Sequence, residues 1–274
     1  MRTRKAQRLQ DDRGGAVRPS RRALILGAGA LLLARPRPAR AQAPSHAAFT
    51  DLLQRYVVPG RDGLNRVRYA AFQASSRPAL DRYIADLSQT RVDALPPADA
   101  YAFWVNLYNA VTLQVVLAHY PVASIRDIDL GGGFFSRGPW KKDLVSVGGQ
   151  GLSLDDIEHG ILRKHYSDPR VHYAVNCASI GCPNLATRAY TGADLERMLD
   201  DGARAFVNHP RGVRVERRGI RASRIYSWFS EDFGTERQLL RHWSRHAAPQ
   251  LRADLADARG IAGYDYDWGL NDAN

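Results

Sequence analysis

Residues 97–120, PADAYAFWVNLYNAVTLQVVLAHY, are the clearest structural signal in the chain. Pro97 suits the first turn of a helix, where a missing N–H costs nothing, and Pro121 stops the run. Apolar side chains at helical spacing share one face: Phe103, Leu107, Ala110, Val111 and Val115. The other faces also carry too much apolar and aromatic bulk to meet solvent. We therefore predict that residues 97–120 form the central buried helix of the domain.

The sequence on either side predicts helices and short strands without regular alternation. Apolar periodicity indicates helices over residues 46–58, 80–87, 193–208, 224–233 and 236–246, and Ser153 opens a capping box for a helix that ends near His165. Strands are expected over 67–72 and 171–175, and hairpins across 143–152 and 213–222. The pattern predicts an α+β fold, a single compact domain with short, mostly antiparallel strands around the central helix.

The N-terminus has the three parts of an export signal. Arg21 and Arg22 precede an uncharged apolar run over residues 23–33, and residues 35–38 then restore basic and proline residues. An apolar run of 11 residues is too short to span a bilayer, which needs about 20 helical residues. We predict a twin-arginine signal peptide over residues 1–43, cleaved after Ala41 or Ala43, followed by one domain over residues 44–274. An uncleaved anchor or a disordered basic tail is the alternative.

Export would change how the charge of the chain is read. Of its 39 basic and 28 acidic residues, eleven and two lie in residues 1–43, which leaves 28 basic against 26 acidic residues, a net charge of +2. A mature chain this close to neutral gives no argument for a nucleic-acid partner. We expect a periplasmic or secreted protein without a stable membrane anchor, whose partners during export are the twin-arginine translocase and a signal peptidase.

Four stretches carry a family resemblance: residues 102–110, 152–163, 176–183 and 223–233. In this order they resemble the bacterial family catalogued as domain of unknown function 547. The resemblance implies a single globular domain that is often exported, and it implies no particular reaction.

Cys177 and Cys182 are the only cysteines, and they flank a turn of small residues, NCASIGCP over 176–183. In an oxidising compartment the two are expected to pair, and the turn would have to fold back to bring them together. The other interpretation makes Cys177 a nucleophile. His159 would be its base, oriented by Glu158 or Asp155, and Cys182 would be a resolving partner if the site is redox-active.

Several further side chains are candidates for a pocket. Asp155 and His159 share a helical face at four-residue spacing, which suits an oriented base or half of a metal site, although acidic residues are also common in any first helical turn. The predicted pocket-lining residues are Asn106, Asn109, Ser179, Trp140 and His172. Two of these, Asn106 and Asn109, are buried amides that need partners, and they either fasten a turn or line the pocket. His172 is either functional or a hydrogen-bonded core residue.

A glycine-preceded loop over residues 134–142 adds aromatic and cationic side chains, among them Phe134, Phe135, Arg137 and Trp140. It would either close over a ligand or cap the core. The sequence offers no complete metal-ligand set and no cofactor motif, so we expect neither a metal nor a cofactor.

Two functions follow from these residues. The first is a disulfide-stapled binding or accessory domain with an unidentified ligand or protein partner. The second is a cysteine-dependent hydrolase or transferase in which Cys177 attacks and His159 moves the proton.

Overall fold

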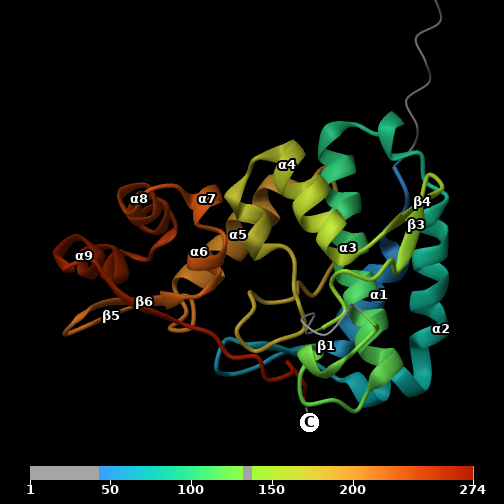
Figure 1. The fold of residues 1–274 in the computed structure, drawn as a ribbon, viewed down its shortest axis with the longest axis horizontal. Helices are drawn as coiled ribbons and strands as arrows, with labels where there is room; N and C mark the ends of the chain where they lie inside the picture. Colours follow the sequence, from blue (N-terminus) through green and yellow to red (C-terminus); the bar gives the residue numbers. More distant parts are fainter. Residues whose placement is uncertain (1–42, 132–137, 274) are drawn as a thin grey trace, which may run out of the picture. The chain divides into compact units, whose positions relative to one another are not determined.

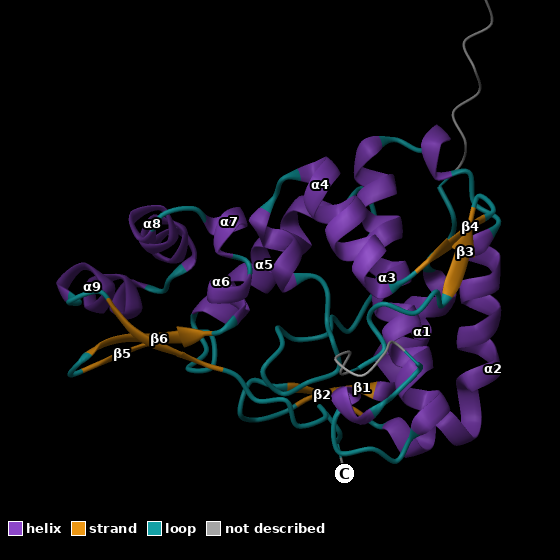
Figure 2. Ribbon diagram, viewed as in Figure 1, coloured by secondary structure: helices purple, strands orange, loops and turns teal. Residues whose placement is uncertain are grey.

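The structure, a computed structural model, describes residues 43–131 and 138–273 (Figure 1). The expected signal peptide up to residue 42 and the loop residues Phe134, Phe135 and Arg137 lie outside the described residues. Figure 2 shows helices and short strands mixed along the chain, and the described residues form one compact unit. The predicted α+β class is confirmed.

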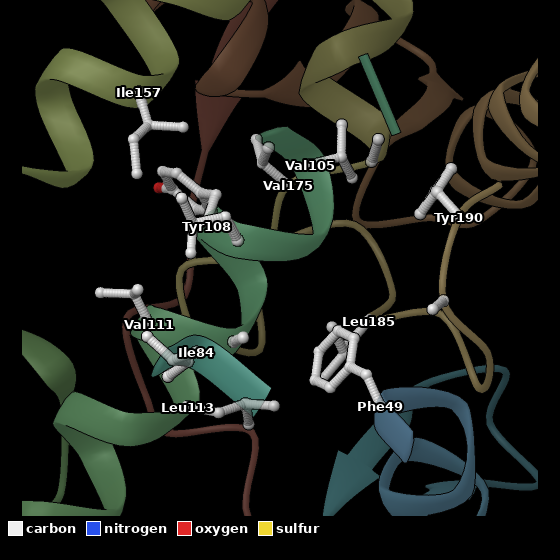
Figure 3. Close-up of a cluster of buried hydrophobic side chains, with 14 of the residues drawn as sticks. Phe49, Ile84, Val105, Tyr108, Val111, Leu113, Ile157, Val175, Leu185 and Tyr190 are labelled. Atoms are coloured by element: carbon white, nitrogen blue, oxygen red, sulfur yellow. The ribbon is translucent and has the colours of Figure 1, made fainter. Parts of the chain in front are cut away.

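The predicted central helix is confirmed as α3, Pro97–His119, with Pro97 in its first turn. Sixteen of its 23 residues are buried, on every side of the helix. Helix α2, Tyr69–Ser88, packs against both α3 and α1, Ala47–Tyr56, and side chains from all three helices meet in the main core (Figure 3). Among the described residues α3 is the one helix long and apolar enough to cross a membrane, but 89% of its apolar window is buried inside the protein.

The strand predicted over residues 67–72 is wrong. Strand β2 is Asn65–Val67, paired antiparallel with β1, Val57–Pro59, and helix α2 already begins at Tyr69 and runs to Ser88. The helix predicted over residues 80–87 is therefore the C-terminal part of α2, which contains Pro78 in its interior. Its buried residues recur at helical spacing from Tyr69 onward, so packing against α3 outweighs the local cost of the proline.

Both predicted hairpins are confirmed. Strands β3, Val145–Val147, and β4, Gln150–Leu152, are joined by Gly148 and Gly149, whose φ angles of 60° and 80° suit a tight two-residue turn. Strands β5, Val213–Glu216, and β6, Gly219–Ser223, pair in the same antiparallel way. A third strand that the sequence analysis missed, β7, Ile261–Asp265, joins β6 in parallel.

The helix predicted after Ser153 is present but changes its winding. The Ser153 hydroxyl accepts from the Asp156 N–H at 3.1 Å, and the Asp156 carboxylate accepts from the Ser153 N–H at 2.9 Å, as in a capping box. The segment Asp156–Leu162, η3, is a π-helix, and α4, Arg163–Tyr166, completes the run. The π segment carries both Glu158 and His159.

The strand predicted over residues 171–175 is also wrong, because the chain forms a 3₁₀ helix, η4, over Pro169–Tyr173. The Asp168 side chain accepts from the Arg170 N–H at 2.8 Å, and Pro169 occupies the first turn. This cap and proline favour a helical turn over the apolar residues that follow. His172 therefore lies on a helical turn rather than on a strand.

The C-terminal part builds a second core. Helix α5, Leu195–Val207, was predicted and contributes to both cores. The run predicted over 224–233 is two short helices, α6 (Ile225–Trp228) and α7 (Ser230–Phe233), separated at Phe229. Helix α8 spans Glu236–His246 as predicted, and α9, Pro249–Asp257, was not predicted. Two short 3₁₀ turns complete the elements, η1 (Val92–Ala94) and η2 (Ile125–Asp127).

The chain after β7 returns to the cysteine turn of residues 176–183. The N–H groups of Ile180 and Gly181 donate to the carbonyls of Gly269 and Asp267, each at 2.8 Å. A Cβ on Gly181 would lie 2.8 Å from both the nitrogen and the oxygen of Asp267. The backbones at positions 181 and 267 thus lie too close together for a side chain at position 181, and this explains why the residue is glycine.

Gly181→Ala is therefore expected to lower the free energy of unfolding by about 1–3 kcal/mol, because backbone must move to admit the methyl group. Gly160, on the exposed side of η3, is the matched control, since a Cβ there meets nothing within 4 Å. Gly160→Ala is expected to raise stability by up to about 1 kcal/mol. Urea unfolding measures both, and equal effects would contradict the close approach.

Candidate functional site

A cavity of about 200 Å³ lies where the two cores meet. Its walls come from α3, the η3 helix, η4, the cysteine turn, α6 and the chain after β7. The lining residues are Tyr108, Trp140, Asp155, Glu158, His159, His172, Val175, Cys177, Cys182, Pro183, Ile225, Trp228, Phe229, Tyr266 and Trp268. Most of this surface is apolar, and the titratable groups are gathered on the η3 side and at the cysteine turn.

The cysteine turn brings Cys177 and Cys182 together, as the disulfide prediction requires. Both are free thiols in this structure, and their Sγ atoms lie 2.7 Å apart. The backbone N–H of Cys177 also donates to the Cys182 sulfur at 3.1 Å. The predicted fold-back is present, and the covalent bond itself stays a prediction.

Asn176 and Asn109 hold the start of this turn. The Asn176 side chain donates to the Pro183 carbonyl at 2.7 Å and accepts from the Ala178 N–H at 2.8 Å, while Ala178 has a left-handed φ of 59°. From α3, Asn109 donates to the Ala174 carbonyl and accepts from the Asn176 N–H, both at 2.9 Å. The buried amide of Asn109 therefore holds the backbone at two points, Ala174 and Asn176, where the chain enters the turn.

Asn106 acts in the same way at a different loop. Its amide donates to the Tyr190 carbonyl at 2.8 Å and accepts from the Tyr190 N–H at 2.9 Å. Neither Asn106 nor Asn109 is among the described residues that line the cavity. The sequence left open whether these amides fasten a turn or line the pocket, and in the structure they fasten loops.

Tyr266 bridges the cysteine pair and was not singled out by the sequence analysis. Its hydroxyl lies 3.1 Å from the Cys177 sulfur, 3.2 Å from the Cys182 sulfur and 2.7 Å from the Ser179 hydroxyl. Ser179, a predicted lining residue, thus reaches the site through Tyr266 rather than through the wall of the cavity.

The two thiols have different acidities. Burial opposes a charged Cys182, but hydrogen bonds from Cys177 and Tyr266 outweigh it and lower the pKa of Cys182 below that of an ordinary thiol. The hydrogen bond with Cys182, together with burial, raises the pKa of Cys177 well above the ordinary value. A negative charge at this pair therefore resides on Cys182, with Cys177 protonated beside it.

His172 lies between two carboxylates on the opposite wall. Its Nε2 is 2.6 Å from the Asp232 carboxylate, its Nδ1 is 3.7 Å from that of Glu158, and its ring stacks on Phe229 at 4.1 Å. Burial disfavours the charged ring, but both carboxylates outweigh it and raise the pKa of His172. Arg163 also binds Asp232, through Nε at 2.5 Å and Nη2 at 3.1 Å.

His159 lies at the exposed rim of the cavity. Its Nε2 is 3.7 Å from Asp155, the predicted four-residue pair, and its Nδ1 is 3.0 Å from Arg163 Nη1. The hydrogen-bond partners that the described residues give the Cys177 sulfur are Cys182, Ser179 and Tyr266, and no imidazole is among them. His159, Glu158 and Cys177 share the cavity without direct contact between thiol and base.

The remaining wall is aromatic. Trp228, Tyr266 and Trp268 pack on one another with ring centroids 4.6–5.4 Å apart, and Trp140 meets Trp268 edge-on at 5.9 Å. Trp228 is 43% exposed, the one large hydrophobic side chain with such exposure among the described residues. Trp140 was predicted to line a pocket and does. Trp228 was predicted only as part of a helix, and Trp268 lies outside every predicted element, so neither was singled out.

Metal ligation has no support in the part of the chain that the structure describes, where no group of three or more His, Cys, Asp or Glu side chains is arranged to hold an ion.

Residues 92–207 match the model of a family described as a protein of unknown function, DUF547, in agreement with the resemblance found in the sequence. No curated protein and no solved structure matches the chain significantly. The matched residues include α3, η3, η4 and the cysteine turn. Trp228, Tyr266 and Trp268, which complete the cavity, lie beyond the match.

The raised pKa of His172 predicts how stability varies with pH. Because the pKa of His172 in the folded protein lies above the ordinary histidine value of 6.5, the imidazolium contributes fully below pH 6.5, and the contribution is lost as pH rises through the folded pKa. His172→Gln leaves the buried Glu158 without its cation and Asp232 with Arg163 alone, and it is expected to lower stability at pH 6 by about 3 kcal/mol. Urea unfolding from pH 6 to 9 should show this difference shrinking as pH rises.

The exposed His165 of α4 provides the control, because His165→Gln should leave stability nearly unchanged at every pH. A difference between wild type and His172→Gln that stays constant with pH would contradict a charged His172.

Proposed function

We propose that the chain is an exported binding domain whose cavity holds a small molecule with a planar apolar body and a protonated amine. The observation that carries this proposal is the composition of the cavity. Aromatic rings packed on one another at tilted angles form one wall, and the carboxylates of Asp155 and Glu158 line another. Aromatic faces attract both planar apolar groups and cations, and carboxylates accept hydrogen bonds from an amine.

Among the side chains that line the cavity, the carboxylates of Asp155 and Glu158 favour a cation over an anion. His172 and Arg163 are matched by Asp232 and Glu158, so these four groups sum to zero. Asp155 then remains as a carboxylate at the rim, 3.7 Å from His159. Burial and the neighbouring Glu158 raise the pKa of Asp155, and a bound cation would relieve both effects.

Tryptamine and indole-3-acetate test this preference, because they share an indole ring and carry opposite charges. Calorimetric titration of the full chain at pH 7.5 should give tryptamine binding about tenfold or more tighter than indole-3-acetate binding. Trp268→Ala should weaken tryptamine binding by about tenfold through loss of ring contacts. Asp155→Asn should remove the preference between the two probes.

Trp104→Ala is the matched control, since Trp104 packs at the edge of the main core and lines a different groove. It should leave tryptamine binding unchanged. Equal affinities for both probes in the wild type, or equal effects of the two tryptophan substitutions, would contradict the proposed ligand class.

The Cys177–Cys182 contact supports a staple beneath this cavity, closed as a disulfide once the protein meets an oxidising compartment. A cysteine-dependent hydrolase or transferase is the second candidate, because Cys177, Glu158 and His159 line the same cavity. It is less well supported, since the hydrogen bonds of the Cys177 sulfur go to Cys182, Ser179 and Tyr266 rather than to an imidazole.

Export, the remaining part of the proposal, rests on the sequence of residues 1–43. In a host with a twin-arginine translocase, the protein should appear in the periplasm or medium, with an intact mass that begins at Gln42 or Pro44. The pair Arg21→Lys with Arg22→Lys should retain the full-length chain in the cytoplasm. A wild-type chain found full-length in the cytoplasm would contradict export.

A further inference from the structure

The two residues of the cysteine pair differ in exposure. Both line the cavity, but Cys182 is only 5% exposed, whereas Cys177 is partly exposed. A molecule entering the cavity therefore meets more of Cys177 than of Cys182. Thiol–disulfide exchange depends on which sulfur can be attacked, so this asymmetry bears on reactivity.

The two sulfurs also differ in the hydrogen bonds that they accept, because the donors converge on Cys182. A consistent proton arrangement has the Ser179 hydroxyl donating to the Tyr266 oxygen and the Tyr266 hydroxyl donating to the Cys182 sulfur. The Cys177 thiol and the Cys177 backbone N–H also donate to Cys182. Three donors thus converge on the less exposed sulfur, an arrangement that stabilises a thiolate there.

We propose that Cys177 and Cys182 form a redox-active dithiol–disulfide couple that oxidises low-molecular-weight thiols, with Cys177 as the attacked sulfur and Cys182 as the leaving thiolate. A disulfide with a purely structural role would need neither hydrogen-bond donors directed at Cys182 nor exposure of Cys177. The inference uses the cavity of the proposed binding function but requires neither an amine ligand nor export, so either can fail without the other.

The reaction balances in two steps. A thiolate RS⁻ attacks Cys177 Sγ of the disulfide, the bond between the two cysteines breaks, and Cys182 Sγ leaves with the electron pair while R–S–Sγ forms at Cys177. A second thiolate then attacks the R sulfur, forms R–S–S–R, and releases Cys177, which takes up a proton. Two thiols are oxidised and the cysteine pair is reduced by two electrons. A second disulfide restores the pair by the reverse exchange.

The acidities described above favour this direction. A thiol of lower pKa leaves faster, and a stabilised thiolate in the reduced form makes the disulfide a stronger oxidant. The size of the cavity, about 200 Å³, limits the substrate to a small thiol and excludes a folded protein from direct entry.

Redox equilibrium of the full chain in glutathione buffers tests the proposal. The chain is equilibrated at fixed ratios of reduced to oxidised glutathione, alkylated, and analysed by mass. The native pair should interconvert reversibly without unfolding. Tyr266→Phe should shift the equilibrium constant toward the disulfide by about tenfold or more, because it removes a donor to a charged sulfur. Tyr264→Phe, two residues earlier in β7, is the matched control and should cause no shift.

Trapping of the mixed disulfide tests the order of attack. The oxidised full chain is treated briefly with reduced glutathione and then alkylated, and mass analysis should find glutathione on Cys177 and the alkyl group on Cys182. A disulfide that resists glutathione until the protein unfolds, or thiols that never pair, would overturn the redox proposal. So would equal shifts in the two tyrosine variants, or glutathione found on Cys182. Circular dichroism checks that each variant is folded. If a variant does not fold, the redox titration of the wild-type chain alone still tests whether the cysteine pair is redox-active.

Discussion

The site depends on the burial of α3 and on the need to satisfy the polar groups that this helix carries into the core. Asn106 and Asn109 are 0% and 2% exposed, and an unpaired amide in such a place would cost several kcal/mol. Each amide is satisfied by both a carbonyl and an N–H of a distant loop. The core helix therefore does more than fill space, because its polar residues determine where the loop at Tyr190 and the turn at Cys177 must lie.

A second constraint completes the cysteine turn from the other side. Tyr266 and Gly269 lie on the chain that follows β7, which is positioned by its parallel pairing with β6. The turn is thus held between the central helix and the C-terminal segment, and the cavity opens at the junction of the two cores. This explains why side chains widely separated in sequence, such as Tyr108, Cys177 and Trp268, share one small space.

The sequence predicted the parts of this arrangement that have local causes. Helices α1, α3, α5 and α8 follow apolar periodicity, and the β3–β4 hairpin follows its two turn glycines. The two wrong strands, over 67–72 and 171–175, are apolar stretches too short to separate helix from strand by pattern. Their state is decided by packing for α2 and by the Asp168–Pro169 cap for η4. Cys177, Cys182, His159, Glu158, His172 and Trp140 were identified by chemistry alone, whereas Tyr266 and Asp232 were not. Their roles arise from contacts across 60 to 89 residues, which no local pattern encodes.

The π-helix η3 carries acidic and basic side chains of the cavity on both its buried and its exposed side. Neighbouring residues of this segment have opposite surroundings, since Glu158 is buried against His172 while His159 is exposed at the rim. Tyr108 of α3 also lines the cavity, and burial, together with the charges of Glu158 and of the cysteine pair, raises its pKa well above the ordinary value. Tyr108 therefore stays neutral beside these groups. A thiolate on Cys182 adds charge to a region that already holds Glu158 and Asp232, and a protonated His172 is the buried cation that offsets them. The redox state of the cysteines and the protonation of His172 are for this reason expected to be linked, each favouring the other through the same small volume of low dielectric.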